Sequence, residues 1–257
     1  MPPVIPTLTL VTAAERPQIA QAMRTLGASP WPKFLNHGAV VQALWPYLYE
    51  LAPDYQFALL DEKTDSLVAI GNCIPIRWDG NPHSLPDRGL DAVLQDGIAC
   101  LREPAPATAA SALMIVVSPE WRGHGISGKA IRAMADIVAR HGLTDLVAPV
   151  RPTHKHHYPL ISIERYIRWR RHDERPVDPW IRVHERVAGQ ILRPATAAMR
   201  VTGTIADWER WTQTPLPDTG SYTIPGALVP VEIDRERDLG EYNEPACWIR
   251  HRTPHTA

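Results

Sequence analysis

The N-terminal part of the chain carries two different spacings of apolar side chains. An apolar run over residues 8–11 predicts a short strand, and Thr12 with Glu15 three positions later is typical of a helix start, so a helix is expected over 16–26. Farther on, apolar residues three or four positions apart lie on one face of a helix predicted over 39–51. The chain is therefore expected to begin with a strand and two helices.

Two longer apolar runs follow, at residues 55–60 and 67–76. The segment between them, 61–66, is polar and rich in residues that favour turns, so an antiparallel hairpin is predicted. A helix is expected over 90–101, and the Pro-rich stretch 102–107 cannot continue it.

The clearest pattern lies in the middle of the chain. A continuous apolar run at 112–117 predicts a strand covered on both faces. Residues 126–140 have the one-faced apolar spacing of a helix, with Gly142 as its C-cap, and 143–150 predicts a second buried strand. Strand, helix and strand together form a βαβ unit of ordinary length.

The remaining part of the chain has a weaker pattern. Helices are expected over 158–169 and over 180–187, the second ending at Gly189. Pro and Gly turns separate apolar runs that predict strands or extended edges at 191–204, 227–233 and 247–251. Four tryptophans of this part are expected to fill core gaps or to wall an acceptor pocket: Trp180, Trp208, Trp211 and Trp248.

The length and composition are typical of a folded protein of one or two domains. The chain has 257 residues, of which 44% are hydrophobic and 21% charged. Its formal net charge of -1 gives no field that would hold polyanions, so nucleic acid is not an expected partner. Three separated cysteines suit a reducing cytoplasm, and no apolar stretch has the length of a membrane helix or a signal peptide. A cytoplasmic protein without a membrane partner is predicted.

The turn between the strand 112–117 and the helix 126–140 is rich in glycine. Gly123, Gly125 and Gly128 allow backbone N–H groups to approach a phosphate, and the helix start adds unpaired donors and the positive end of a dipole. Gly128 with Lys129 also fits part of the phosphate-binding loop of NTPases. That loop requires Ser or Thr next, as a magnesium ligand, and Ala130 cannot serve, which argues against an NTPase.

The strand, this turn and the following helix resemble the acyl-CoA signature of the GNAT N-acyltransferases. The family pattern is Arg or Gln, two residues, Gly, one residue, and Gly or Ala. Arg122, Gly125 and Ser127 occupy these positions, with Ser127 as a small departure. The order of predicted elements from residue 7 to residue 150 is also similar to that of the family.

This resemblance implies an α/β GNAT fold, with a central mixed, mostly antiparallel twisted sheet flanked by helices and a C-terminal strand-rich extension. Residues 1–175 would form the acyl-CoA-binding core, and 176–257 an extension that completes the sheet and the acceptor side. It also implies that main-chain groups of Val116 and Val117 bind pantetheine. The pyrophosphate would contact the amides of the turn, at Arg122, Gly123, His124, Gly125, Ile126 and Ser127, with Gly128 sharing that role.

Acyl transfer to an amine needs a group that removes a proton from the amine and one that protonates the leaving thiolate. Family members often place a Tyr near the sulfur, and Tyr158, the first Tyr after the last strand of the βαβ unit, is the expected general acid, with Tyr166 as the alternate. The strand 112–117 contains no base. His184 is therefore named as the second catalytic residue, and Glu185 and Glu244 remain alternatives.

The cluster His154, His156 and His157 lacks companion ligands at metal-site spacing, so no metal is expected. The resemblance and the turn together predict a CoA-dependent N-acyltransferase, most simply an N-acetyltransferase, that uses acetyl-CoA or another acyl-CoA as co-substrate and an amine as acceptor. A non-catalytic acyl-CoA sensor and an acyl-CoA decarboxylase of the same fold stay open as alternatives. The acceptor and the oligomeric state, including a homodimer, also stay open.

Overall fold

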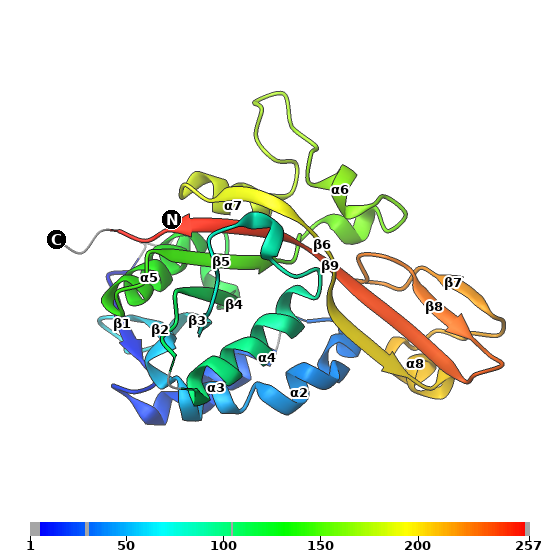
Figure 1. Ribbon diagram of the computed structural model, residues 1–257, viewed down its shortest axis with the longest axis horizontal. Coiled ribbons are helices and arrows are strands. Elements are labelled where there is room, and N and C mark those ends of the chain that lie inside the picture. The colour runs from blue at the N-terminus through cyan, green and yellow to red at the C-terminus, as the bar shows by residue number, and fades with distance from the viewer. Residues whose placement is uncertain (1–5, 29–30, 104, 255–257) are drawn as a thin grey trace.

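The computed structural model describes residues 6–28, 31–103 and 105–254. Their strands form a nine-stranded sheet with helices on both faces (Figure 1). Neighbouring strands follow the order β1-β2-β3-β4-β5-β9-β8-β7, and β6 also pairs with β9. The strands are β1 (Leu8–Thr12), β2 (Gln56–Asp61), β3 (Leu67–Ile76), β4 (Ala109–Val117), β5 (Asp145–Val150), β6 (Gln190–Gly203), β7 (Gly220–Tyr222), β8 (Val231–Asp234) and β9 (Leu239–Arg252).

The helices surround this sheet on both sides. They are α1 (Ala20–Ala28), α2 (Ala39–Leu44), α3 (Tyr47–Leu51), α4 (Gly89–Arg102), α5 (Ile126–Arg140), α6 (Ile163–Tyr166), α7 (Pro179–Arg186) and α8 (Ile205–Thr212). Short 3-10 turns lie at Pro17–Ile19, Lys33–His37, Pro53–Tyr55, Pro82–Ser84, Pro119–Trp121 and Lys155–His157. No helix within the described ranges is long and apolar enough to cross a membrane.

Successive side chains of each strand point to opposite faces of the sheet, so the core has one part on each face. Phe57 and Leu59 pack with the apolar face of α5, whereas Ala58 and Leu60 pack with Met23 of α1. Helices α2, α3 and α4 cover the same face as α1, and α6 and α7 cover the face of α5. In Figure 1, α2, α3 and α4 lie together at the bottom of the view, and α6 and α7 lie at the top.

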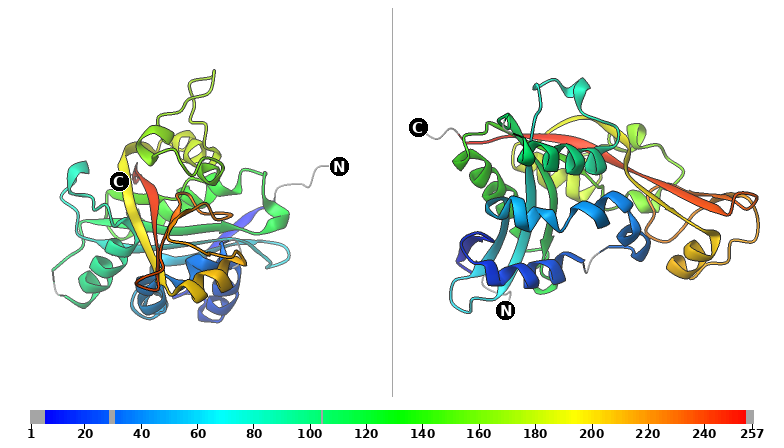
Figure 2. Two further views of the ribbon diagram at one scale, coloured as in Figure 1. Left: turned by 90° about the vertical axis from the view of Figure 1, so that its right-hand side faces the viewer. Right: turned by 60° about the horizontal axis from the view of Figure 1, so that its bottom comes forward.

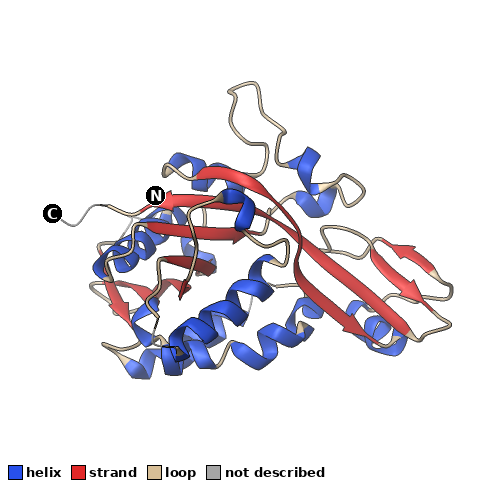
Figure 3. Ribbon diagram, in the orientation of Figure 1, coloured by secondary structure: helices blue, strands red, loops and turns tan. Residues whose placement is uncertain are grey.

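The C-terminal strands continue the sheet of the preceding part of the chain. β9 is antiparallel to β5, with Val150 opposite Cys247. Its opposite edge pairs with β6 from Arg250 to Gly240, and β8 pairs with its first residues, 239–241. The long strands β6 and β9 run side by side out to α8 and the β7–β8 hairpin (Figures 2 and 3). The mixed, mostly antiparallel sheet confirms the predicted fold class, and the division of the chain at residue 175 stays a prediction.

The central elements agree closely with the sequence prediction. The helix expected over 126–140 is α5, and Gly142 has a φ of +74°, as a glycine C-cap requires. The hairpin is β2 and β3, and the helix expected over 90–101 is α4 with one further residue at each end.

Both N-terminal helices differ from the prediction. Thr12 and Glu15 make the expected reciprocal hydrogen bonds, Thr12 N to Glu15 Oε2 at 2.7 Å and Glu15 N to Thr12 Oγ1 at 3.2 Å. The chain then passes through the 3-10 turn that Pro17 opens, and α1 begins only at Ala20. The helix predicted over 39–51 is divided into α2 and α3, because Pro46 has no N–H to continue the hydrogen-bond ladder.

The helix predicted over 158–169 is wrong except for the single turn α6. The residue before a proline avoids the helical region, and Tyr158 precedes Pro159 with φ of -132° and ψ of 55°. The carbonyl oxygen of Tyr158 also accepts a hydrogen bond of 2.8 Å from Nζ of Lys155. The strand expected over 227–233 is likewise shorter, since only Val231–Asp234 pairs in the sheet.

Candidate active site

The turn between β4 and α5 has the backbone conformation that favours glycine. Gly123 and Gly125 have φ of +82° and +75°. A Cβ at either residue would meet no atom within 4 Å, so the backbone conformation and not space accounts for glycine here. Gly125 is also the N-cap of α5, and no side chain caps this helix start. The first amides of α5 therefore stay available to an anion.

Side chains of the same turn add further nitrogen donors. Arg122 lines a large cavity of about 1020 Å³, and its Nε lies 3.3 Å from the carbonyl oxygen of Val117. His124 packs edge-on against Trp121, and its buried Nδ1 has no hydrogen-bond partner among the described residues. An arginine and free amides suit the binding of a diphosphate.

Beside this turn the sheet is open between its two parallel strands. β4 and β5 pair only at Ala110 with Leu146 and at Ser111 with Val147. Beyond these pairs β4 continues to Val117, where its edge facing β5 has no strand partner among the described residues. Unpaired backbone N–H and C=O groups need partners, and the amides of a pantetheine arm would supply them. Val116 and Val117, which the sequence named, both line the cavity in this gap.

The cavity has a volume of about 1020 Å³ and extends to both faces of the sheet. Its wall on the α5 face includes Ser127, Thr153, Trp180 and His184. On the face of α1 to α4 its wall includes six residues with aromatic, charged or sulfur-containing side chains: Arg24, Trp31, Trp45, Tyr49, Glu50 and Met199. One continuous space therefore joins the predicted donor site with the opposite face.

An ion pair lies in the wall of this cavity. Arg151 directly follows β5, and its Nε donates a hydrogen bond of 2.6 Å to Oε1 of Glu244 on β9. Nη2 of Arg151 donates to the carbonyl oxygen of Gly226 at 2.7 Å, and the hydroxyl of Tyr242 donates to Oε2 of Glu244 at 2.6 Å. Burial alone would lower the pKa of Arg151, but the Glu244 carboxylate outweighs this effect and raises it. Arg151 is thus held charged at the wall.

His184 is the predicted catalytic residue that the structure brings to the cavity. It is 3% exposed, and its Nδ1 lies 2.8 Å from Nε2 of His251 on β9. Burial, and to a smaller extent the neighbouring His251, hold the pKa of His184 well below its usual value. The ring is therefore neutral at pH 7.

Tyr158 is not among the described residues that line this cavity. Its side chain is 42% exposed and packs against Trp169 with ring centroids 4.9 Å apart. Tyr166, the alternate, is buried and donates a hydrogen bond of 3.0 Å to Oδ2 of Asp178. A catalytic role for either tyrosine stays a prediction.

The three histidines after β5 contact one another through tilted and edge-on rings. His156 and His157 have ring centroids 4.0 Å apart, and His157 lies edge-on to His154 at 5.5 Å. Within the described ranges no group of three or more His, Cys, Asp or Glu residues has the arrangement of a metal site.

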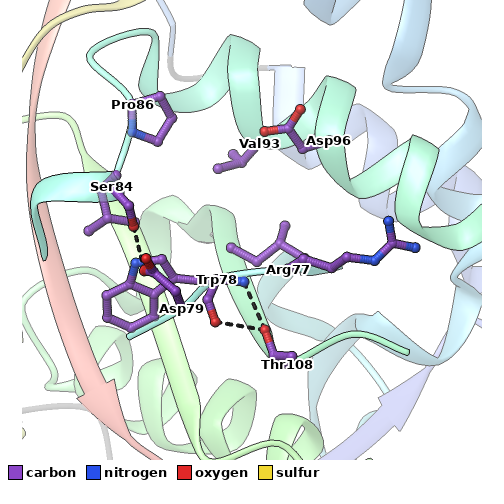
Figure 4. Close-up of a pocket in the computed structure, with 10 residues that line it drawn as sticks. Arg77, Trp78, Asp79, Ser84, Pro86, Val93, Asp96 and Thr108 are labelled. Atoms are coloured by element: carbon purple, nitrogen blue, oxygen red, sulfur yellow. Dashed lines mark hydrogen bonds between the residues drawn. The ribbon is translucent and has the colours of Figure 1, made fainter. Parts of the chain in front are cut away.

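A second cavity, of about 480 Å³, lies between the end of β3 and α4 (Figure 4). Two sets of the polar groups drawn there bond one another: Ser84 Oγ donates to Asp79 at 2.6 Å, and Thr108 Oγ1 bonds both main-chain groups of Trp78. These hydrogen bonds hold the loop after β3 in place.

Sequence reasoning missed several residues of the large cavity. Arg151 could have been found, because it directly follows the last strand of the βαβ unit, where side chains reach the edge of the sheet. Trp45 and Tyr49 were expected only as parts of a helix, and their place opposite Glu244 depends on long-range packing. His251 had no local signal, since its partner His184 is 67 positions away.

The chain is similar to a named enzyme over nearly all its length. It is 31% identical to the arginine N-acetyltransferase avaD of Aspergillus versicolor, over an alignment of 275 residues that covers 96% of this chain and 94% of the relative. No model of a known protein family matches the chain.

Two solved structures share the fold. The loading GNATL domain of CurA from Lyngbya majuscula superposes with a TM-score of 0.60 at 17% identity, covering 97% of this chain and 99% of that domain. The GNAT-like decarboxylase GphF, in complex with isobutyryl-CoA, has a TM-score of 0.56 at 16% identity and covers 96% of this chain and 100% of that one. At these identities the likeness concerns the fold alone.

The relative that aligns over nearly the whole chain and the shared fold together identify the family that the glycine turn indicated. The chain belongs to the GNAT superfamily and is a CoA-dependent N-acyltransferase that takes acetyl-CoA or another acyl-CoA as co-substrate.

Proposed function

We propose that acyl-CoA enters from the α5 face and the amine acceptor from the face of α1 to α4. The amides and side chains of the turn would hold the pyrophosphate, at Arg122, Gly123, His124, Gly125, Ile126, Ser127 and Gly128. The main chain of Val116 and Val117 would pair with pantetheine. The observation that carries this proposal is the single cavity that passes through the gap between β4 and β5.

The acceptor that we propose is free arginine. The name of the 31% identical relative supports this choice, and the charges of the cavity support it independently. An amino acid carries a carboxylate and an ammonium group on one carbon, and the buried pair of Arg151 and Glu244 is complementary to both. Arg151 has five N–H donors, of which Glu244 and Gly226 accept from Nε and Nη2, so it can also bind an α-carboxylate.

The guanidinium of the acceptor would lie at Glu50. This carboxylate is exposed at the rim of the cavity, and no ion pair holds it among the described residues. Trp45 lines the cavity beside it and offers an aromatic face to the aliphatic chain and to a planar cation, whereas the guanidinium of Arg24 lies over the Tyr49 ring, 4.6 Å from its centroid. Recognition at both ends would favour an amino acid with a cationic side chain over a simple amine.

Acyl-CoA supplies the acyl group as a thioester. Glu244 would accept a proton from the α-ammonium group, whose nitrogen then forms a bond to the acyl carbon as the carbon–sulfur bond breaks. Its carboxylate has lone pairs beyond those that Arg151 and Tyr242 use, so it can receive this proton without losing its position. The nitrogen loses a second proton as the amide forms, and the thiolate takes up one proton to leave as the thiol. Tyr158 remains the residue proposed from the sequence for that step, and Tyr158→Phe would test it through turnover.

Acetyl transfer to a panel of amines tests the proposed acceptor. Release of free thiol from acetyl-CoA is followed with arginine, lysine, agmatine and citrulline. We expect arginine to exceed agmatine, which lacks the carboxylate, by at least about tenfold in kcat/KM, because a charge-assisted contact is lost. The product should carry the acetyl group on the α-nitrogen. Faster reaction with agmatine, or acetylation of the guanidinium, would overturn the proposal.

We also propose that the enzyme acts in the cytoplasm as a reduced protein. Cys73, Cys100 and Cys247 are free and buried, and burial raises the pKa of the Cys73 and Cys247 thiols, which protects them from oxidation. Fractionation of cells that express the tagged chain would test the location. Light scattering of the purified protein would decide whether it forms the homodimer that the sequence left open.

A further inference from the structure

The side chain of Tyr49 is held firmly on the wall of the large cavity. Tyr49 belongs to α3, is partly exposed and lines the part of the cavity that lies on the face of α1 to α4. Its ring packs against the buried cluster that includes Ile70 and Val116, and the guanidinium of Arg24 lies 4.6 Å from the ring centroid. Apolar packing and a cation therefore fix the ring in place.

A chain of hydrogen bonds fixes the direction of the Tyr49 hydroxyl. Nε2 of Gln56 donates to the main-chain carbonyl oxygens of Ala52 and Cys73, at 2.8 and 3.0 Å. Oε1 of Gln56 must then face Asn72, and because this oxygen can only accept, Nδ2 of Asn72 donates to it at 2.8 Å. The other proton of Nδ2 goes to Oη of Tyr49, at 3.1 Å. The hydroxyl thus accepts from Asn72 and keeps its own proton for another partner.

That proton is available to a ligand. Among residues 6–28, 31–103 and 105–254 no group accepts it. Burial raises the pKa of Tyr49 above its ordinary value, whereas the hydrogen bond from Asn72 and the charge of Arg24 act in the opposite direction. The hydroxyl is therefore protonated at pH 7. A donor whose direction is fixed before a ligand binds is well suited to stabilise charge that develops on an acceptor atom.

The proposed route of acyl-CoA brings an acceptor atom to this place. The pyrophosphate would lie at the turn that follows Val117, so an arm that pairs with Val117 and Val116 must run back along β4. Its thioester end would then lie beyond Val116, beside residues 113–115, which line the cavity. Asn72 on β3 pairs with Met114 on β4, and Met114 packs against the same buried cluster as the tyrosine ring. The hydroxyl therefore lies next to this stretch of β4.

We infer that the hydroxyl of Tyr49 donates a hydrogen bond to the oxygen of the acyl-CoA thioester and stabilises the negative charge that this oxygen gains in the reaction. As the amine nitrogen bonds to the acyl carbon, the π electron pair of the carbonyl group moves to the oxygen, and it returns when the carbon–sulfur bond breaks. No proton leaves Tyr49, so the proton transfers proposed above are unaffected. The inference rests on the proposed route of acyl-CoA, and it does not depend on arginine as acceptor.

Tyr49→Phe removes the hydroxyl and keeps the ring. A fixed donor to such an oxygen contributes about a hundredfold or more to kcat, so we expect kcat to fall by about this factor with the amine that reacts fastest with the wild type. The value of kcat/KM should fall with kcat. Kd for acetyl-CoA should rise by less than about threefold, because the contact strengthens only as the charge develops.

Tyr47→Phe is the matched control on the same helix. The guanidinium of Arg102 lies 5.0 Å from the ring centroid of Tyr47, much as Arg24 lies over Tyr49. Tyr47 is 36% exposed, however, and it is not among the described residues that line the large cavity. Its replacement should leave both kcat and Kd as in the wild type.

The infrared band of the thioester carbonyl reports the contact directly and needs no amine. Acetyl-CoA that is isotope-labelled at the carbonyl carbon is bound to each protein, and a hydrogen bond to the oxygen lowers the frequency of the band. The band should move to higher frequency in Tyr49→Phe and stay in place in Tyr47→Phe. Replacement of Tyr49 by a ring-fluorinated tyrosine keeps the hydroxyl as a stronger donor and should move the band to lower frequency, so the test does not depend on how the fold tolerates Tyr49→Phe.

Wild-type kcat in Tyr49→Phe, or a carbonyl band that does not move, would overturn the inference. Equal losses of kcat in Tyr49→Phe and Tyr47→Phe would also overturn it, because they would assign the effect to the packing of α3. A higher Kd at unchanged kcat would place the hydroxyl against another part of the donor. Failure of the proposed route of acyl-CoA would instead appear as normal acetyl-CoA affinity in Gly125→Asp, so the two failures can be told apart.

Discussion

Nε of Arg151 lies 2.6 Å from Oε1 of Glu244, and this contact joins the end of β5 to β9 across 93 positions of the chain. The Arg151 side chain is 19% exposed and the Glu244 side chain 6%, so water screens the pair only weakly. Removing one partner of such a pair leaves the other charge buried, which typically costs about 3–5 kcal/mol. The pair is therefore expected to contribute to the stability of the fold and, separately, to the reaction of the acceptor.

Glu244→Gln should reveal both consequences. The amide cannot accept the proton of the amine or balance Arg151, so kcat/KM for arginine should fall by at least about a hundredfold. The free energy of unfolding should fall by about 3 kcal/mol. Thiol release and urea denaturation measure the two effects. Wild-type turnover in Glu244→Gln would remove Glu244 from the proposed mechanism.

Glu241→Gln is the matched control on the same strand. Glu241 pairs with Arg200 at the surface and does not belong to the wall of the large cavity among the described residues. An exposed pair contributes less than about 1 kcal/mol, so stability should change little and turnover should not change. If both glutamine variants lost activity equally, the effect would belong to the strand and not to the cavity.

Glu50→Gln should change the choice of acceptor more than the rate of transfer. The carboxylate is exposed at the rim, so its contact with a guanidinium is worth only about 1 kcal/mol, or roughly fivefold in KM for arginine. Citrulline, whose side chain is uncharged, should show no such change. Comparison of KM for both acceptors in wild type and variant measures the effect, and an equal change for both would place the guanidinium elsewhere.

Local signals account for the parts of the fold that the sequence predicted well. The helix α5 has one apolar face, a glycine at each end and an apolar strand before it, so each local preference agrees with the final structure. The site predicted from this region needs only backbone amides and glycine conformations, which lie within a few residues of one another. Val116, Arg122 and Gly125 could therefore be named without knowledge of the fold.

The acceptor side depends on contacts that no local pattern contains. Glu244 was named as one of several bases, but nothing near it in the sequence indicated Arg151 as its partner. Glu244 pairs with Met199 next to the place where the register of β6 and β9 shifts, and such a shift has no signal in the local sequence. Proline had the opposite effect: Pro46 carried a clear local signal, and it divides a helix that apolar spacing alone predicts as continuous.

The buried histidine pair should make the protein sensitive to acid. Below about pH 6.5 the unfolded chain takes up protons on its histidines, whereas His251 in the folded protein stays neutral to about pH 4. The unfolded state then binds more protons, so stability is lost as the pH falls through this window.

For His251 alone the expected loss between pH 7 and pH 5 is about 2 kcal/mol. Urea denaturation at both pH values measures it. His251→Gln should lose less stability than wild type between the two pH values, and His172→Gln should lose the same amount as wild type. An unchanged pH dependence in His251→Gln would mean that other groups cause the acid sensitivity.

Two glycines have the same backbone conformation, so matched substitutions at them can distinguish a loss of acyl-CoA binding from an effect of backbone strain. Gly125 and Gly142 have φ of +75° and +74°, and at both positions an added Cβ would meet no atom within 4 Å. Aspartate tolerates the left-handed region better than most residues, so Gly125→Asp and Gly142→Asp should fold and lose similar, modest stability. Only Gly125→Asp sets a carboxylate beside the amides at the start of α5.

Repulsion from that carboxylate should abolish detectable binding of acetyl-CoA in calorimetry, because it competes for the same amides and opposes the charge of the diphosphate. Gly142→Asp lies at the other end of α5 and should bind acetyl-CoA as the wild type does. Normal affinity in Gly125→Asp would show that the diphosphate lies away from this turn. Equal loss in both variants would instead assign the effect to the helix as a whole, so the ratio of the two Kd values decides whether the glycine turn holds the donor.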